Sequence, residues 1–197
     1  MKALVSHQID AAAAMTYNEL AQVLETKNPK TGKLYTLGDL NVMKMQSQGT
    51  GMLEDGLFTT TNWLKATGNR DIAERFIAAS DRGWIYCRDH YQQCTDIVVK
   101  QRTALPHGHQ LWQMNEINAL IWPAPLGIGV MNQADFKRTA TIALKYKQIK
   151  KAANPNATYD HALAKAALQY LRNHVGGIDV VAKGWHKAVV HVTAGGR

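Results

Sequence analysis

Apolar residues recur along most of the chain at helical spacing. Leu20, Val23 and Leu24 fall at i, i+3 and i+4, which predicts an amphipathic helix. The longest predicted helix runs from about residue 69 to residue 88, with an inner face of Ile72, Phe76, Ser80, Gly83, Trp84 and Cys87. Further helices are predicted at residues 1–9, after a cap at Thr60 or Thr61, after a cap at Asn132, and from a cap at Thr158 to Gly176-Gly177. Another is predicted around Cys94, Ile97 and Val98, all three of which face inward. The helix predicted from Pro106 to Ile121 has an apolar stripe of Leu111, Met114, Ile117, Leu120 and Ile121.

Short apolar or alternating runs predict a few strands. They are the alanine run after Asp10, Leu40–Met45, Leu57–Thr60 and Val189–Val192. The alanine run is also compatible with a helix, because alanine is the best helix former. Strands near the start followed by many helices predict an α/β class that is helix-rich. So few strands leave a doubly wound sheet incomplete, so part of the sheet is expected to lie outside this chain.

Tyr17, Asn18 and Glu19 directly follow the first predicted strand. In open α/β sheets ligands bind just beyond the carboxyl ends of strands, so these three residues are the candidate ligand-binding site. A carboxylate accepts hydrogen bonds from an amino group or a protonated ring nitrogen, and a tyrosine stacks on an aromatic ring. The alternative is that Glu19 only begins the following helix, where a negative charge suits the helix dipole.

The net charge of the 197-residue chain is +8, but its basic residues are spread out. The densest cluster, Lys145–Lys151, lies at a predicted helix end, and no nucleic-acid-binding motif accompanies it. A solvated basic surface is therefore predicted instead of a nucleic-acid interface. No apolar run is long enough to span a bilayer. The first five residues resemble the start of a signal peptide that Ser6 and His7 interrupt, so either the protein is cytoplasmic or its N-terminus lies elsewhere.

Two pairs of residues raise the question of metal or thiol chemistry. Cys87 and Cys94 form either a local disulfide in an exported protein or two reduced thiols. His107 and His109 offer two imidazoles, but spacing places no third ligand, so they are interpreted as exposed loop histidines. No metal site and no cofactor are predicted.

Two further motifs are interpreted as turns. Glu54 and Asp55 are adjacent, and adjacent residues on a strand face opposite ways, which makes them a poor acid–base pair. The Gly127–Gly129 segment lacks the third glycine of a dinucleotide-binding fingerprint and is predicted to be a turn joining two helices. No catalytic residue is assigned.

Seven stretches, in order along the chain, carry a family resemblance: residues 8–12, 17–19, 51–58, 76–89, 112–118, 121–123 and 127–131. Together they resemble the periplasmic substrate-binding proteins of the NMT1/THI5-like family, over nearly all of the chain. The resemblance implies a two-lobed, type II periplasmic-binding-protein-like α/β fold that lacks its N-terminal part here. Residues 1–38 then correspond to the end of the second lobe, 39–51 to the hinge crossing and 52–197 to the C-terminal part of the first lobe.

By the same resemblance, Tyr17 and Glu19 correspond to residues that contact a heteroaromatic ligand. This implies a receptor for a thiamine pyrimidine precursor that delivers its ligand to the permease subunits of an ABC transporter, in the periplasm. The alternatives are a nitrate or alkanesulfonate receptor, a thiamine pyrimidine synthase-like enzyme and an inert truncated fragment. The cysteine-rich iron motif and the substrate histidine of the synthase are not recognisable, so we expect no catalysis.

Overall fold

The computed structural model describes residues 1–197, and its regular structure is helical. It contains no β-strand, and its one isolated antiparallel bridge joins Lys27 and Leu34. The helices are α1 (Lys2–Val5), α2 (Glu19–Leu24), α3 (Thr61–Lys65), α4 (Asn69–Asp89), α5 (Tyr91–Gln101), α6 (His107–Ile121), α7 (Gln133–Lys145), α8 (Pro155–Thr158) and α9 (His161–His174), with 3₁₀ turns η1 (Leu37–Asp39), η2 (Met45–Gln48) and η3 (Ala194–Gly196).

Side-chain caps fix where several of these helices begin. The Thr60 hydroxyl accepts from the backbone N–H of Trp63 at 3.2 Å, and the Asn132 side chain accepts from the backbone N–H groups of Ala134 and Asp135, so both predicted caps are confirmed. The predicted cap Thr158 was wrong. Asn154 starts the one-turn helix α8 that Thr158 ends, and Asp160 then caps α9 by accepting from two backbone N–H groups at 2.9 and 3.2 Å.

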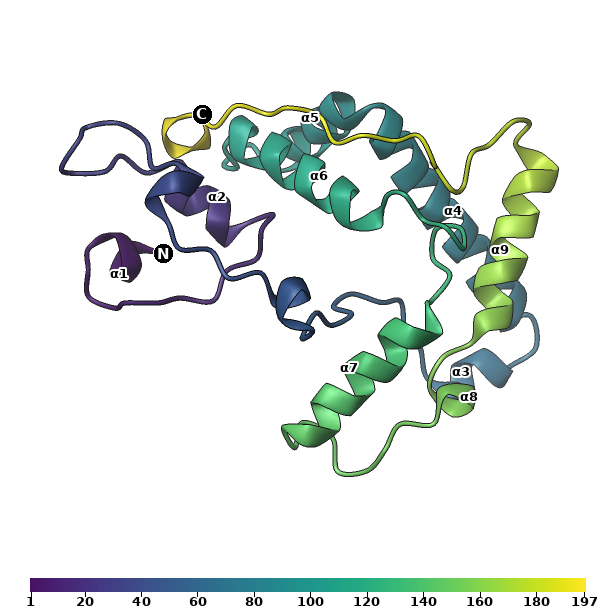
Figure 1. Cartoon of the computed structure of the whole chain (residues 1–197). Helices are drawn as coiled ribbons and strands as arrows, with labels where there is room; N and C mark the ends of the chain where they lie inside the picture. The colour runs from purple at the N-terminus through teal and green to yellow at the C-terminus, as the bar shows by residue number, and fades with distance from the viewer. The chain divides into compact units, whose positions relative to one another are not determined.

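The chain divides into two compact units. Unit 1 comprises Met1–Val42, Trp84–Pro123 and Ala182–Arg197. Within it α5 and α6 pack side by side, and α2 and the C-terminal turn η3 contact α6 (Figure 1). Its buried apolar residues are Ala21, Val23, Leu24, Ile85, Cys94, Trp122 and Ala182. Helix α6 is therefore the element on which this unit is assembled.

Unit 2 comprises Met43–Gly83 and Ala124–Val181. Its core consists of Ala78, Ile128 and Val180 together with the inner face of α9, which is Leu163, Ala167, Leu168 and Leu171. The segment 124–129 is bonded to residues 180–181, because the Ile128 N–H donates to the Val180 carbonyl at 3.0 Å. Gly127 and Gly129 have positive φ and lie between α6 and α7, so the prediction of a turn joining two helices is confirmed.

The four predicted strands were wrong for this chain. The alanine run, 41–44, 51–60 and 185–193 are stretches without strand pairing, and no neighbouring strand lies beside any of them. In the last stretch a side chain takes the place of a partner strand. The Asn115 amide of α6 donates to the Ala188 carbonyl at 2.8 Å and accepts from its N–H at 3.1 Å. The helix-rich part of the fold prediction is confirmed, and the α/β part is not seen within this chain.

The predicted inner face of α4 was also wrong. Ala78, Asp81, Ile85 and Arg88 are buried, whereas Phe76 is 60% exposed and Ile72 is likewise exposed. These buried residues also recur at helical spacing. Two of them, Asp81 and Arg88, are ionisable, so a search for apolar residues does not find them. The Arg88 guanidinium lies 4.8 Å from the centre of the Trp122 ring, so a cation–π contact accounts for its burial.

Helices α5 and α6 depart from the apolar pattern in the same way. Cys94 is buried as predicted, but Ile97 is exposed and Thr95 is buried in its place, with its hydroxyl bonded to the Tyr91 carbonyl. The predicted apolar stripe of α6 is half-buried or, at Leu120, exposed. The fully buried residues of α6 are His109, Asn115, Glu116 and Asn118. Each of these polar side chains has a bonding partner within unit 1.

Candidate functional site

The predicted site residues lie at the start of α2 in unit 1. The extended run 11–15 is followed by a turn at Thr16–Asn18, and Glu19 is the first residue of the helix. Tyr17, Asn18 and Glu19 are all half-buried. They therefore do not follow a paired strand, but they remain together at one junction between extended chain and helix.

The Glu19 carboxylate is held by its own segment. One of its oxygens accepts from the Met15 backbone N–H at 2.9 Å, and the other accepts from the Asn18 side-chain amide at 3.4 Å. Its place in the first turn of α2 also suits the positive end of the helix dipole. Each carboxylate oxygen keeps room for a second hydrogen bond, since an ionised carboxylate has about four acceptor positions.

A buried polar chain connects this junction to α6. The His109 ring lies between two residues of the N-terminal segment: Nδ1 is 2.9 Å from a Glu25 carboxylate oxygen, and Nε2 is 3.1 Å from the Asn18 side-chain oxygen. His109 and Glu25 are each 9% exposed. The ring nitrogens thus connect a buried carboxylate to a neutral side-chain amide through two hydrogen bonds.

The direction of the Asn18 amide follows from its neighbours. Its oxygen faces Nε2 of His109 and the amide of Gln22 at 3.1 Å, so its nitrogen is left to donate to Glu19. Three residues on from His109, and thus on the same side of α6, the Trp112 indole N–H donates to the Thr16 carbonyl at 2.9 Å. Helix α6 therefore contacts the residue just before the predicted site and the middle residue of that site.

The last 3₁₀ turn, η3, packs against His109 and Glu25. The Gly195 N–H donates to the Glu25 carbonyl at 3.0 Å. A Cβ on Gly196, which has a φ of +67°, would lie 2.7 Å from the His109 Cβ, so only glycine fits here. These contacts account for the burial of His109 and Glu25.

Sequence reasoning missed Glu25, His109 and Trp112. The interpretation of His109 as an exposed loop residue was wrong, because it lies in the first turn of α6 and is buried. Its neighbour His107 is exposed, and its ring is 2.8 Å from an Asp96 carboxylate oxygen. The two histidines have different partners, and no group of three or more His, Cys, Asp or Glu side chains gathers in the structure. No local signal in the sequence marks a partner 84 residues away.

The remaining candidates fall elsewhere. Cys87 and Cys94 form a disulfide that links the end of α4 to α5, which settles the alternative that the sequence left open. Glu54 and Asp55 lie on an exposed extended segment. Of the tryptophans, Trp122 is 3% exposed, as expected of a core residue.

Unit 2 holds an unusual carboxylate of its own. Asp81 on α4 is 6% exposed, and one of its oxygens is buried with no hydrogen-bond partner. Gly129 lies against it, because a Cβ at that position would be 3.1 Å from the other oxygen. Burial raises the pKa of Asp81 to about 7, so this side chain carries a proton below neutrality.

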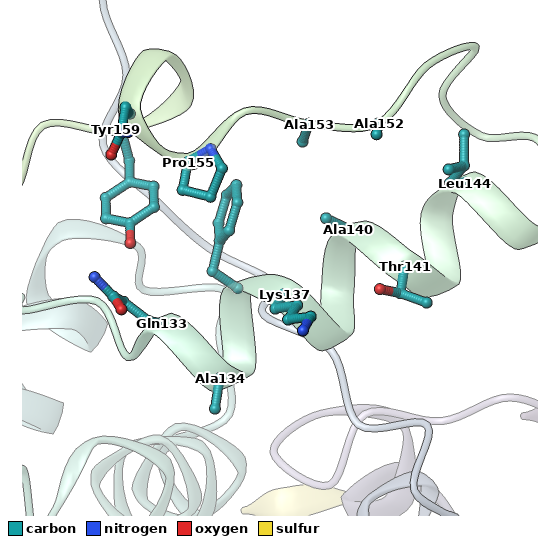
Figure 2. Close-up of a pocket in the computed structure, with 12 residues that line it drawn as sticks. Gln133, Ala134, Lys137, Ala140, Thr141, Leu144, Ala152, Ala153, Pro155 and Tyr159 are labelled. Atoms are coloured by element: carbon teal, nitrogen blue, oxygen red, sulfur yellow. The ribbon is translucent and has the colours of Figure 1, made fainter.

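Two hollows lie on unit 2. The first, of about 550 Å³, lies between α7 and the segment 152–159, as Figure 2 shows, and the second, of about 710 Å³, is formed by residues 149–154 with Ala157 and Thr158. Neither is lined by Tyr17, Asn18 or Glu19. The predicted ligand site and these hollows are therefore separate features of the chain.

A family comparison identifies the first part of the chain. Residues 1–94 match the family model described as NMT1/THI5 like, so this part of the chain is similar to that family. The match confirms the resemblance over the segment that carries Tyr17, Asn18 and Glu19, and it does not extend to residues 95–197. No curated protein and no solved structure matches the chain.

The family covers binding proteins for nitrate, sulfonates and thiamine precursors. The match therefore supports a small-molecule-binding theme, and the family suggests a protein that acts outside the cytoplasm. None of the helices combines the length and the apolar character that a membrane crossing requires.

Proposed function

We propose that the chain is part of the solute-binding component of an ABC importer and that it binds a small heteroaromatic ligand such as a thiamine pyrimidine precursor. Tyr17, Asn18 and Glu19 are the proposed ligand contacts. The permease subunits of the transporter are the proposed protein partners. In this proposal residues 1–38 end the second lobe, 39–51 form the hinge crossing and 52–197 belong to the first lobe of a type II α/β binding protein.

The observation that supports this proposal best is the fixed carboxylate of Glu19. Its two in-chain hydrogen bonds set the orientation of the group, and each oxygen can still accept one more bond. An aminopyrimidine offers an amino group beside a ring nitrogen that can be protonated, so it presents two adjacent donors. A carboxylate that is held in place before binding loses little freedom when it accepts them.

The same carboxylate disfavours the anion-receptor alternative. Nitrate and sulfonates are negatively charged acceptors, and a negative carboxylate that is in no ion pair would repel them. The half-buried Tyr17 ring suits stacking on a planar heterocycle. Both features favour an aromatic donor ligand over a small anion.

The enzyme alternative lacks support from the cysteines. Both are joined in the Cys87–Cys94 disulfide, so neither offers a free thiolate to iron. A disulfide also suits an oxidising compartment such as the periplasm, where we propose that the protein acts.

Calorimetric titration tests the proposal. The chain is titrated separately with an aminopyrimidine thiamine precursor, with nitrate and with taurine. We expect binding heat with the pyrimidine alone, and a loss of at least about tenfold in affinity for Glu19→Gln, because a charge-assisted acceptor is removed. The control Glu54→Gln, on an exposed segment, should bind like the parent chain.

Two outcomes would contradict the proposal. Binding heat with nitrate or taurine, and none with the pyrimidine, would show that the ligand is an anion instead of a heteroaromatic compound. Consumption of pyridoxal phosphate in the presence of iron would favour the synthase-like enzyme.

A further inference from the structure

The hollow beside α7 is lined by seven apolar residues and by Gln133, Lys137, Thr141, Asn156 and Tyr159. Figure 2 shows the α7 side chains Ala140 and Leu144 on one side and Ala152, Ala153 and Pro155 on the other. Phe136 and Tyr159 also line the hollow, and their ring centres are 4.8 Å apart. The volume of about 550 Å³ lies in the range of small-molecule sites, which runs from about 300 to 1,000 Å³.

One polar group in this hollow has no partner. The Tyr159 hydroxyl is buried and makes no hydrogen bond within the chain. Its ring is held from two sides, by Phe136 and by the His161 ring at 4.1 Å, so the hydroxyl cannot easily turn away. A buried donor without an acceptor is costly, by about 1–3 kcal/mol. The hydroxyl is covered in this conformation, so an acceptor on a bound molecule would remove that cost only after the Tyr159 ring shifts enough to uncover it.

The charge around the hollow is of one sign. Lys137 lines it, and Lys150 and Lys151 line the second hollow, which shares Ala152 and Ala153 with the first. No aspartate or glutamate occurs between Asp135 and Asp160, and none of these three lysines is in an ion pair. The exposed lysines thus give an apolar hollow a positive rim without internal neutralisation.

From these three observations we propose that the α7–α8 hollow binds a small anionic amphiphile, a carboxylate carrying an acyl chain of medium length. The acyl chain of the ligand lies on the alanines, Leu144 and Phe136, and the lysines attract its carboxylate. A shift of the Tyr159 ring on binding uncovers its hydroxyl, which then donates to an oxygen of the ligand. The volume favours one small molecule over an acidic helix of a partner protein, which would need a longer groove. The site lies within unit 2 and does not depend on the proposed pyrimidine receptor.

The test uses octanoate as the probe, with octan-1-ol and octylamine as matched ligands of different charge. Binding to the whole chain is followed by calorimetry and by two-dimensional NMR of the backbone amides. We expect octanoate to bind with amide shifts in residues 133–159, and octanol and octylamine to bind at least about tenfold more weakly, since each lacks the negative charge.

Variants separate charge from packing. Lys150→Glu with Lys151→Glu should weaken octanoate binding about tenfold, and Tyr159→Phe about threefold, because the ring stays while its hydroxyl is removed. Lys165→Glu, which reverses an exposed lysine of α9 outside both hollows, is the charge-matched control and should leave binding unchanged. Circular dichroism checks that each variant retains its helices.

Three results would overturn the proposal. Equal affinity for all three ligands would reduce the hollow to non-specific apolar adsorption. Octanoate shifts outside residues 133–159, or none, would place binding elsewhere or exclude it. An acidic amphipathic peptide that binds these residues more tightly than octanoate would assign the surface to a protein partner.

Discussion

Asp81 shows how one buried carboxylate sets the pH response of its unit. Its folded-state pKa is raised to about 7 by burial, above the ordinary value of 3.8. The folded state therefore holds this proton over a range in which the unfolded chain has lost it. The free energy of unfolding therefore falls as pH rises from about 4 to about 7. Above that range the full cost of holding the ionised Asp81 carboxylate in the interior is present.

Asp81→Asn removes this ionisable group at nearly constant volume. We expect the free energy of unfolding of the variant, minus that of the parent chain, to be about 3 kcal/mol larger at pH 8 than at pH 4.5, because the charge can no longer form in the interior. Urea unfolding at the two pH values measures this change. Asp55→Asn, at an exposed residue, is the control. If Asp81→Asn changed the free energy of unfolding by the same amount at both pH values, the assigned role of Asp81 would be contradicted.

His109 is the second residue whose role depends on burial. His109→Ala would leave the Glu25 carboxylate buried without its partner and would remove one of the two partners of the Asn18 oxygen, which then keeps only Gln22. We expect a loss of about 3 kcal/mol in unfolding free energy and weaker pyrimidine binding, because Asn18 no longer fixes Glu19. His107→Ala, which removes an exposed pair on the same turn, should cost less than about 1 kcal/mol. Equal losses in urea unfolding would contradict the assigned role.

At the scale of elements, the cap of α9 is a local feature with a measurable effect. Asp160 accepts from two backbone N–H groups, and its other oxygen lies 2.9 Å from Arg70. The Arg70 hydrogen bond lowers the pKa of Asp160, so this contribution is present above the ordinary value of 3.8 and is lost as pH falls below it. Asp160→Ala should cost about 1 kcal/mol at pH 7 in urea unfolding, whereas Asp160→Asn, which keeps the cap, should cost less. The reverse order would contradict the capping role.

The disulfide is a second feature at this scale, because it ties the end of α4 to α5. Closing so short a loop in the unfolded chain should contribute about 2 kcal/mol. The parent chain should therefore melt at a lower temperature in dithiothreitol. The Cys87→Ser/Cys94→Ser double variant should melt at that lower temperature with or without the reductant. A melting temperature of the parent that ignores reduction would contradict a formed disulfide.

The ends of helices were more predictable than their faces. Thr60 and Asn132 cap through bonds to residues two or three positions on, so short sequence patterns carry the information. Burial depends on distant partners instead. The burial of Asn115 follows from Ala188, 73 residues away, and no local periodicity contains that contact.

Across the whole molecule, the dependence on distant partners also explains why the four predicted strands did not form. A strand needs a neighbour, and the extended runs of this chain have none. Residues 51–60 are the clearest case. Their sequence predicts a strand at Leu57–Thr60, yet Leu57 is 64% exposed and Phe58 is 97% exposed, so no neighbouring element covers them. The site residues Tyr17, Asn18 and Glu19 could be chosen from their place after an apolar run and from the family resemblance, but the α6 residues that hold them could not.

The central claim is that a heteroaromatic donor ligand binds at the start of α2, against Glu19. Two-dimensional NMR of the isotope-labelled chain during titration with an aminopyrimidine thiamine precursor tests it most directly. The account predicts saturable shifts of the amides of residues 16–19 and of the Trp112 indole N–H, which donates to Thr16. Shifts confined to other residues, or no shift at millimolar ligand, would contradict it.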